Sequence, residues 1–137
     1  MIQFTPESYD ALVNHAKTGA PEEICGLLEG KREGGHAQVT TIHPISNVAT
    51  HRETCYTLDP EQQLAAMDAI EERGAAVVGF YHSHPAGPQQ PSATDEAQAT
   101  WGGYSYVIVS LSGKPFVGSW EWTGEGFVQE IVSVGGN

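Results

Sequence analysis

Residues 75–85 read AAVVGFYHSHP, an almost unbroken apolar run that ends in two histidines and a proline. Such a run is typical of a central strand that is covered on both faces of a sheet. Positions i and i+2 of a strand point to the same face, so His82 and His84 can converge on one metal ion. Pro85 cannot continue the hydrogen-bonded ladder, which places both rings at a strand end beside a loop. A His-x-His pair alone does not establish a metal site.

A carboxylate follows the histidine pair at the start of the next predicted helix. Asp95 lies in the first turn of a helix announced by Pro91 and Ser92, after a loop rich in proline and glycine. From there its side chain can reach back to the strand end. Two histidines and one aspartate leave one tetrahedral position for water, which is the ligand count of a catalytic zinc site. The competing interpretation is that Ser92 only caps the helix and that the negative charge of Asp95 only interacts with the helix dipole.

A catalytic zinc site also needs a general base that takes a proton from water and passes it to the leaving amine. The candidates are Glu96, next to Asp95, and Glu22 and Glu23, which precede an apolar stretch at 24–28. Spacing alone does not choose among these carboxylates. A place on the solvated surface is the alternative for each of them.

Three helix starts are recognisable in the chain. Thr5-Pro6, Asp59-Pro60 and Ser92 each combine a capping side chain with a following proline or acid. The helices are expected to end near positions 19, 73 and 101, where glycines follow. The side chains expected on the inner side of the second helix are Leu64, Met67 and Ile70.

Apolar and alternating stretches predict the strands. They are expected at 24–28, 38–45, around 55–58, 75–81 and 104–111, with a turn at 31–35 and a final hairpin of 116–123 and 127–134. About three helices and seven or eight strands predict an α/β (α+β) fold, a sheet with helices packed against it.

Size and charge narrow the possible functions. The chain has 137 residues and a mass of 14.7 kDa, the size of one ordinary domain. Its formal net charge of −11 repels phosphate backbones, so nucleic-acid binding is not expected. No apolar run approaches the roughly 20 residues of a membrane span, and the N-terminus does not resemble a signal peptide. Two cysteines cannot build a disulfide framework, which favours a reduced, cytoplasmic setting.

Other chemistries find little support in the sequence. The Pro-Cys-x-x-Cys signature of zinc deaminases and the His-Glu-x-x-His of helical zincins are both absent. Cys25 and Cys55 are expected to be small core residues and not nucleophiles. The tryptophans at 101, 120 and 122 are expected to pack in the core or in the hairpin. The histidines without partners at ligand spacing, which are expected to face solvent, are His15, His36, His43 and His51.

Three stretches together resemble the JAMM (MPN-plus) metalloprotease family: PEEICGLL at 21–28, HSHP at 82–85 and PSATD at 91–95. The family pattern is Pro-x-Glu-x-x-Gly-Leu-Leu, then His-Ser-His-Pro and Ser-x-x-Asp, and each block aligns without gaps. Asn47 and residues 56–60 and 78–81 resemble its small prokaryotic branch. The resemblance implies a JAB/MPN-like fold, with a mixed, curved sheet and about three helices packed against it. It also implies one catalytic domain over residues 1–137.

The resemblance implies a role for each motif residue. His82, His84 and Asp95 would hold one Zn²⁺ per chain, with water as the fourth ligand. Glu23, and not Glu22, would be the general base, since the family's acid lies two positions after the motif proline. The residue that would donate a hydrogen bond to the oxyanion of the tetrahedral intermediate is Ser92.

The resemblance also implies a substrate class. There is room for only one short helix between Asp95 and the strand at 104–111, as in compact prokaryotic members that process ubiquitin-like or sulfur-carrier proteins. The implied reaction is hydrolysis of an amide bond at or after the C-terminal Gly-Gly tail, which would enter an open groove as an added strand. A catalytically silent MPN-like interaction module and a JAMM hydrolase for another amide substrate are the alternatives. The sequence leaves monomer and dimer open.

Overall fold

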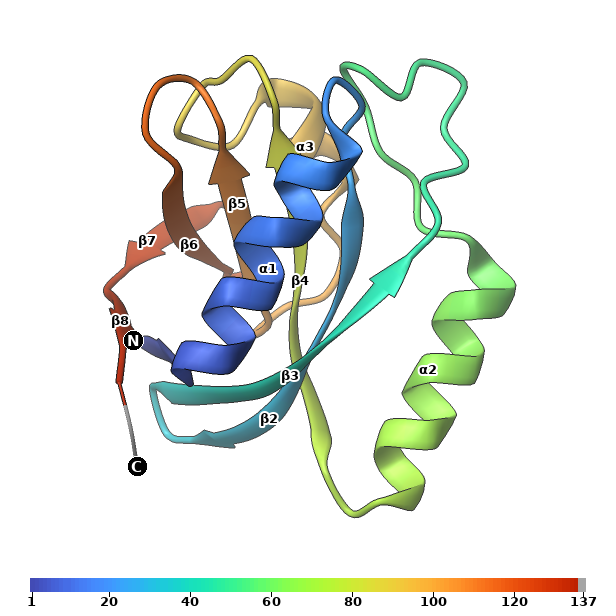
Figure 1. The fold of residues 1–137 in the computed structure, drawn as a ribbon. Helices are drawn as coiled ribbons and strands as arrows, with labels where there is room; N and C mark the ends of the chain where they lie inside the picture. Colours follow the sequence, from blue (N-terminus) through green and yellow to red (C-terminus); the bar gives the residue numbers. More distant parts are fainter. Residues whose placement is uncertain (136–137) are drawn as a thin grey trace.

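The structure, a computed structural model, describes residues 1–135. In this part of the chain, eight strands form one curved mixed sheet and three helices pack against it (Figure 1). The predicted fold class is confirmed. The helices are α1 (Pro6–Gly19), α2 (Pro60–Glu72) and α3 (Ala93–Gln98). The strands are β1 (Ile2–Phe4), β2 (Cys25–Glu33), β3 (His36–Ile45), β4 (Ala76–His84), β5 (Ser105–Ser110), β6 (Phe116–Trp122), β7 (Phe127–Glu130) and β8 (Val132–Val134).

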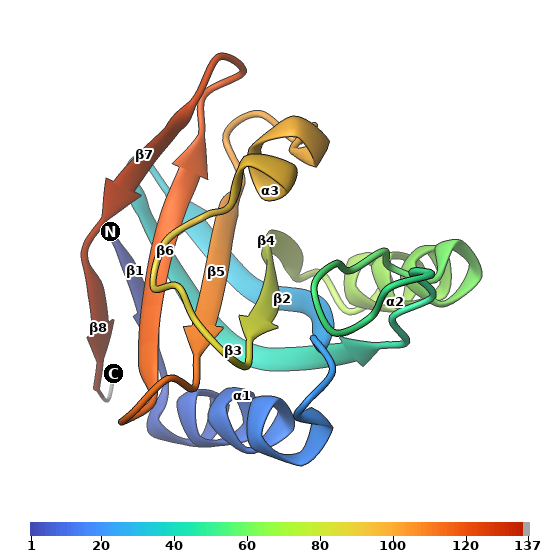
Figure 2. The ribbon, with the colours of Figure 1, turned by 90° about the horizontal axis from the view of Figure 1, so that it is seen from above.

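The sheet has the order β7-β6-β5-β4-β2-β3-β1-β8. Strand β4 lies in the middle, antiparallel to β2 and parallel to β5. The two edge strands of the sheet, β7 and β8, are consecutive in the chain and are separated only by Ile131. The sheet therefore curls round until its two edges meet, as the view from above shows (Figure 2).

The helices begin where the capping residues predict. The Thr5 hydroxyl accepts a hydrogen bond from the Ser8 N–H at 3.1 Å, and Asp59 Oδ1 accepts from the second and third helical amides of α2. Ser92 caps α3 in the same way. Helix α2 is followed by Gly74 at φ +76°, a left-handed conformation that glycine adopts at no steric cost. In residues 1–135 no helix has both the length and the apolarity to cross a lipid bilayer.

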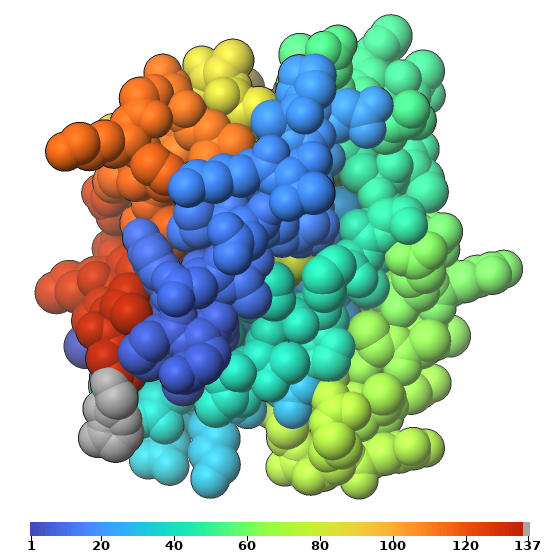
Figure 3. Space-filling view, viewed as in Figure 1, coloured from blue at the N-terminus to red at the C-terminus, as the bar shows by residue number. Residues whose placement is uncertain are grey.

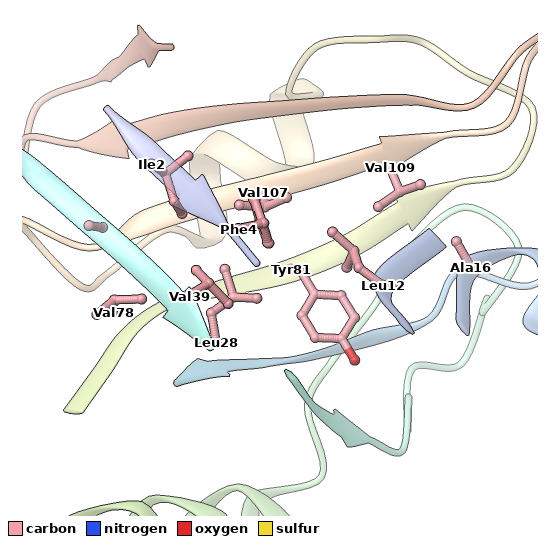
Figure 4. Packing of buried hydrophobic residues seen from close by; sticks show 11 residues of the cluster. Ile2, Phe4, Leu12, Ala16, Leu28, Val39, Val78, Tyr81, Val107 and Val109 are labelled. Carbon is pink, nitrogen blue, oxygen red and sulfur yellow. The ribbon is translucent and has the colours of Figure 1, made fainter. Parts of the chain in front are cut away.

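The sheet separates two apolar clusters. On one face, α1 packs Leu12 and Ala16 against Tyr81 and the valines of β5 (Figure 4). On the other face, Ile70 of α2 and Ala99 after α3 pack against Phe80 and its neighbours. Alternation along β4 therefore directs Phe80 and the next even-numbered residues, 82 and 84, toward the side of α2 and α3. The fold positions the histidine pair on this face.

Three predictions of local structure were wrong. β2 continues to Glu33, so the turn is limited to Gly34 and Gly35, since residues 30–33 find partners in β3. Residues 55–58 form only an isolated bridge, Asn47 with Leu58, and not a strand. The side chain of Leu64 is 62% exposed, so it does not lie on the inner side of α2.

Both termini of the described chain also differ from the prediction. The last strand is broken at Ile131, because β7 pairs with β6 whereas β8 crosses to pair with β1 at the opposite edge. Strand β1 itself was not predicted. It has only three residues and is stabilised by parallel pairing with β3 and β8, which no local pattern reveals.

Candidate metal centre

Three side-chain donor atoms converge at the end of β4. His82 Nε2 and His84 Nε2 lie 3.1 Å apart, and Asp95 Oδ2 lies 3.1 Å from the first and 3.0 Å from the second. All three residues are buried, with exposed fractions of 2%, 3% and 8%. The structure thus brings the predicted ligands together from a strand and from the helix that follows its loop.

Glu23, the predicted base, lies in the segment just before β2. Cys25 is opposite His82 in the antiparallel ladder, and the Ser83 N–H donates to the Ile24 carbonyl at 3.0 Å. The Ser83 hydroxyl in turn accepts from the Ile24 N–H at 2.9 Å. This pairing places Glu23 beside the histidines, and one ligand atom from each of Glu23, His82 and His84 lies within 4.8 Å of the others.

Hydrogen bonds orient the ligands. The His84 Nδ1–H donates to the Pro88 carbonyl at 2.9 Å, which orients the ring with Nε2 directed into the cluster. The Ser92 N–H donates to Asp95 Oδ2 at 2.9 Å, and the Asp95 N–H donates to Ser92 Oγ at 3.0 Å. This reciprocal pair is the capping box of α3. Capping and ligand placement therefore coexist, and the helix start fixes the carboxylate.

Burial and hydrogen bonds shift the pKa values of all three residues in the cluster. Burial opposes ionisation of Asp95, but hydrogen bonds from the two imidazoles hold the pKa of its carboxyl far below the usual range. Burial lowers the pKa of His82. Burial also disfavours charge on His84, but its bonds to Asp95 and to the Pro88 carbonyl raise the pKa of this imidazole. Asp95 Oδ2 thus lies within hydrogen-bond distance of the Nε2 atoms of both imidazoles.

The donor spacing fits a tetrahedral metal ion. With metal–ligand bonds of about 2.0–2.1 Å, the donors of a tetrahedral zinc site lie about 3.3 Å apart. The observed separations of 3.0–3.1 Å are close to that edge length. Two imidazoles, one carboxylate and a nearby second carboxylate form a donor set that suits Zn²⁺.

Glu23 differs from the other carboxylates considered as the base. Its side chain is 5% exposed, and Oε1 is buried without a hydrogen-bond partner among residues 1–135. Burial raises the pKa of Glu23 to about 7. Glu22, by contrast, is a surface residue that pairs with Arg52 at 3.3 Å, and Glu96 is exposed. The geometry favours Glu23 as the proton acceptor beside the cluster.

Cys25 lies in the core as expected, whereas Cys55, His15 and His43 differ from the prediction. Cys25 is buried, and burial raises the pKa of its thiol to about 12, which makes it a poor nucleophile. Cys55 is half-buried. His15 was expected to face solvent, but its Nδ1 lies 2.8 Å from the Tyr81 hydroxyl. His43 pairs with Glu29 at 2.6 Å. Both contacts join residues far apart in sequence, so ligand spacing could not reveal them.

One residue beside the site was missed by the site analysis. Tyr56 lies with its ring stacked on His82, at 4.2 Å between centroids and 20° between planes. It also lines a cavity of about 270 Å³ together with Phe80, Trp101 and Tyr106. A tyrosine in a loop carries no signal of such a contact, except that the family resemblance includes residues 56–60.

Two features characterise this protein: a curved mixed sheet, and a cluster of donor atoms at the end of its central strand. Residues 5–123 match the family model described as prokaryotic homologs of the JAB domain. The chain therefore belongs to this family, and the resemblance drawn from its motifs is confirmed.

Curated relatives give the same result. The chain is 41% identical to a desampylase of Haloferax volcanii, an alignment that covers 97% of this chain and 96% of the relative. It is 38% identical to a probable TtuB-protein conjugate cleaving protease of Thermus thermophilus, over 72% of this chain and 63% of that protein. It is 40% identical to a CysO-cysteine peptidase of Mycobacterium tuberculosis, over 74% and 67%. The second of these relatives is named as a protease and the third as a peptidase.

Solved structures show the same fold. The solution structure of a Desulfitobacterium hafniense protein matches with a TM-score of 0.91 at 32% identity, covering 100% of this chain and 94% of that chain. A JAB1/MPN domain protein from Archaeoglobus fulgidus matches with a TM-score of 0.65 at 18% identity, over 98% and 97%. The second match bears on the fold alone.

Proposed function

We propose that this protein is a zinc-dependent peptidase or isopeptidase of the JAMM type. The observation that carries the proposal is the buried Oε1 of Glu23, which has no hydrogen-bond partner within residues 1–135 and lies beside three converging donor atoms. A carboxylate kept without a partner in a buried place is costly and needs a functional reason. Catalysis of amide hydrolysis supplies that reason.

His82, His84 and Asp95 would hold one zinc ion per chain, with a water molecule as the fourth ligand. Zinc bound there would supply a Lewis acid and would lower the pKa of a coordinated water to about 7. Glu23, a buried carboxylate beside the two histidines, would take the proton from water. The same carboxyl then gives the proton to the leaving nitrogen, so it returns to its starting state after each cycle.

Ser92 is the proposed donor to the oxyanion. Its Oγ accepts the Asp95 N–H at 3.0 Å, and a hydroxyl that accepts one bond can still donate its own proton. The same capping box that holds Asp95 holds this hydroxyl beside the ligand cluster. A preorganised donor at the developing negative charge is worth about 10²–10³ in rate.

The proposed substrate is a ubiquitin-like or sulfur-carrier protein, cut at or after its C-terminal Gly-Gly. The relatives named for desampylation, TtuB conjugates and CysO-cysteine support this class. A Gly-Gly tail fits because it lets a backbone approach buried donor atoms without side-chain collision. We place the enzyme in the cytoplasm, acting through one domain over residues 1–137, as a monomer or a dimer.

The test is cleavage by zinc-loaded protein of carrier fusions and carrier–lysine conjugates from the same genome. We expect a cut after Gly-Gly, about one zinc per chain, and loss of both in Asp95→Ala. A chain that binds zinc but leaves every carrier intact would exclude this substrate class. Failure to bind zinc would favour a silent interaction module.

A further inference from the structure

The loop that joins β3 to α2 contacts both the segment that contains Glu23 and the ring of His82. We call residues 47–57 the clamp loop. On one side it contacts the segment between α1 and β2, which contains Glu23, and on the other side its Tyr56 stacks on His82. In the space-filling view the loop, in green, lies next to the blue segment that follows α1 (Figure 3). The mechanism proposed above uses none of its residues.

Asn47 lies at the base of this loop and uses its whole amide. Its Nδ2 donates to the carbonyls of Glu23 at 2.9 Å and Cys55 at 3.0 Å. Its Oδ1 accepts from the N–H groups of Ala49 and Thr57, both at 3.0 Å. A backbone carbonyl can only accept and a backbone N–H can only donate. This set of partners therefore fits one orientation of the Asn47 amide and no other.

The backbone of Glu23 is thereby held at both ends of the residue. Its N–H donates to the Arg52 carbonyl at 2.7 Å, and its carbonyl accepts from Asn47. Both partners belong to the clamp loop. The side-chain Oε1 of Glu23 has no hydrogen bond of its own within the described chain. The position of this carboxylate therefore depends on how firmly its backbone is held.

We infer that Asn47 is a positioning residue for the reaction: it fixes the backbone of Glu23 relative to the His82–His84–Asp95 cluster. The inference rests on the proposed function, since it matters for catalysis only if Glu23 moves the proton. A displacement of about 1 Å at a reacting group can cost about 10²-fold in rate. The same loop carries Tyr56, so a loosened loop also releases the ring that covers His82.

The test variant is Asn47→Asp, which keeps the acceptor and replaces the donor to the Glu23 carbonyl with a second oxygen. We expect kcat to fall about 10–100-fold while KM stays within about twofold, because placement of the base is lost but substrate contacts remain. Zinc stoichiometry should remain that of the wild type. Hydrogen exchange of the Glu23 amide, measured without substrate, should become faster.

Two matched variants isolate the effect. Asn14→Asp makes the same charge change at an exposed position of α1 and should leave kcat and exchange unchanged. Gln62→Ala removes the bonds from Gln62 to the Ser46 backbone and hydroxyl, which loosens the chain just before the loop without touching Glu23. It should lower stability but not kcat. Should Asn47→Asp fail to fold, Asn47→Ser retains a short acceptor for the Ala49 amide and lacks the amide donor.

The outcomes separate this inference from the proposed function. Wild-type kcat and a wild-type rate of hydrogen exchange at Glu23 in both Asn47 variants would overturn the inference about Asn47. If Glu23→Gln is inactive in the same assay, the proposed function still holds. Faster exchange over the whole chain would also overturn the inference about Asn47, since Asn47 would then be a general structural residue. If the wild type cleaves no carrier, the proposed function fails, and exchange at Glu23 alone decides whether the clamp exists.

Discussion

Glu23 and Glu29 are almost equally buried, but the hydrogen bonding of their carboxylates differs. Their exposed fractions are 5% and 7%. Glu29 Oε1 lies 2.6 Å from both Arg73 Nη2 and His43 Nε2. Those hydrogen bonds overcome the effect of burial and lower the pKa of Glu29, whereas burial without such bonds raises the pKa of Glu23 to about 7. The difference distinguishes a carboxylate that ties the end of α2 to the sheet from the one that we propose as the proton acceptor.

The largest expected difference is in catalysis. Glu23→Gln should lower kcat by about 10²–10⁴-fold, because it removes the proton acceptor and leaves His82, His84 and Asp95 intact. Zinc stoichiometry should be retained. Glu29→Gln should change kcat less than twofold. Steady-state cleavage of a carrier fusion measures both, and a wild-type rate in Glu23→Gln would show that another group is the base.

The second difference is in the pH dependence of stability, measured in chelator by urea unfolding. The raised pKa of Glu23 gives a contribution that is complete below about pH 4.5 and is lost as pH rises toward 7, up to about 3 kcal/mol. The lowered pKa of Glu29 gives a contribution present above the pKa of the unfolded chain and lost as pH falls below it. Replacing each glutamate by glutamine should remove one trend only. Identical pH profiles for the two variants would contradict the comparison.

The third difference concerns the partner of Glu29. Arg73→Met should lower the free energy of unfolding by about 1–3 kcal/mol, because it removes a charged hydrogen bond from a buried carboxylate. Activity at 25 °C should be retained, since Arg73 does not contact the ligand cluster. Denaturant midpoints and kcat, measured on the same preparation, check this. A large loss of kcat without a loss of stability would mean that the Glu29 pair serves the site.

The smallest effect is expected for Arg73→Lys. Lysine keeps the positive charge but lacks the planar fork of arginine, so the loss should be below about 1 kcal/mol. Comparing its denaturant midpoint with that of Arg73→Met separates charge from hydrogen-bond geometry. Equal losses in both variants would show that geometry matters more than charge.

Local chemistry made much of the fold and the convergence of His82, His84 and Asp95 predictable. Thr5, Asp59 and Ser92 start their helices through hydrogen bonds to amides only two or three residues away. The apolar run before His82 marks the central strand, and strand alternation sets the direction of both histidines. These features depend on short-range geometry, which the order of residues contains.

Contacts between distant segments were not predictable in this way. The choice between Glu22 and Glu23 depends on which of them turns inward where β2 pairs with β4, and spacing alone left it open. The pairing of His43 with Glu29 and the stacking of Tyr56 on His82 need the sheet to be assembled first. The break at Ile131 likewise follows from closure of the sheet and not from any local signal.

The curling of the sheet has a consequence for solubility at high concentration. An open sheet presents two free backbone edges that can recruit further chains and seed fibrils. Here the outermost strands are β7 and β8, with four and three residues, and they meet across Ile131. Edges this short offer few unpaired amide groups to a neighbouring molecule. The architecture therefore limits edge-to-edge self-association of the protein.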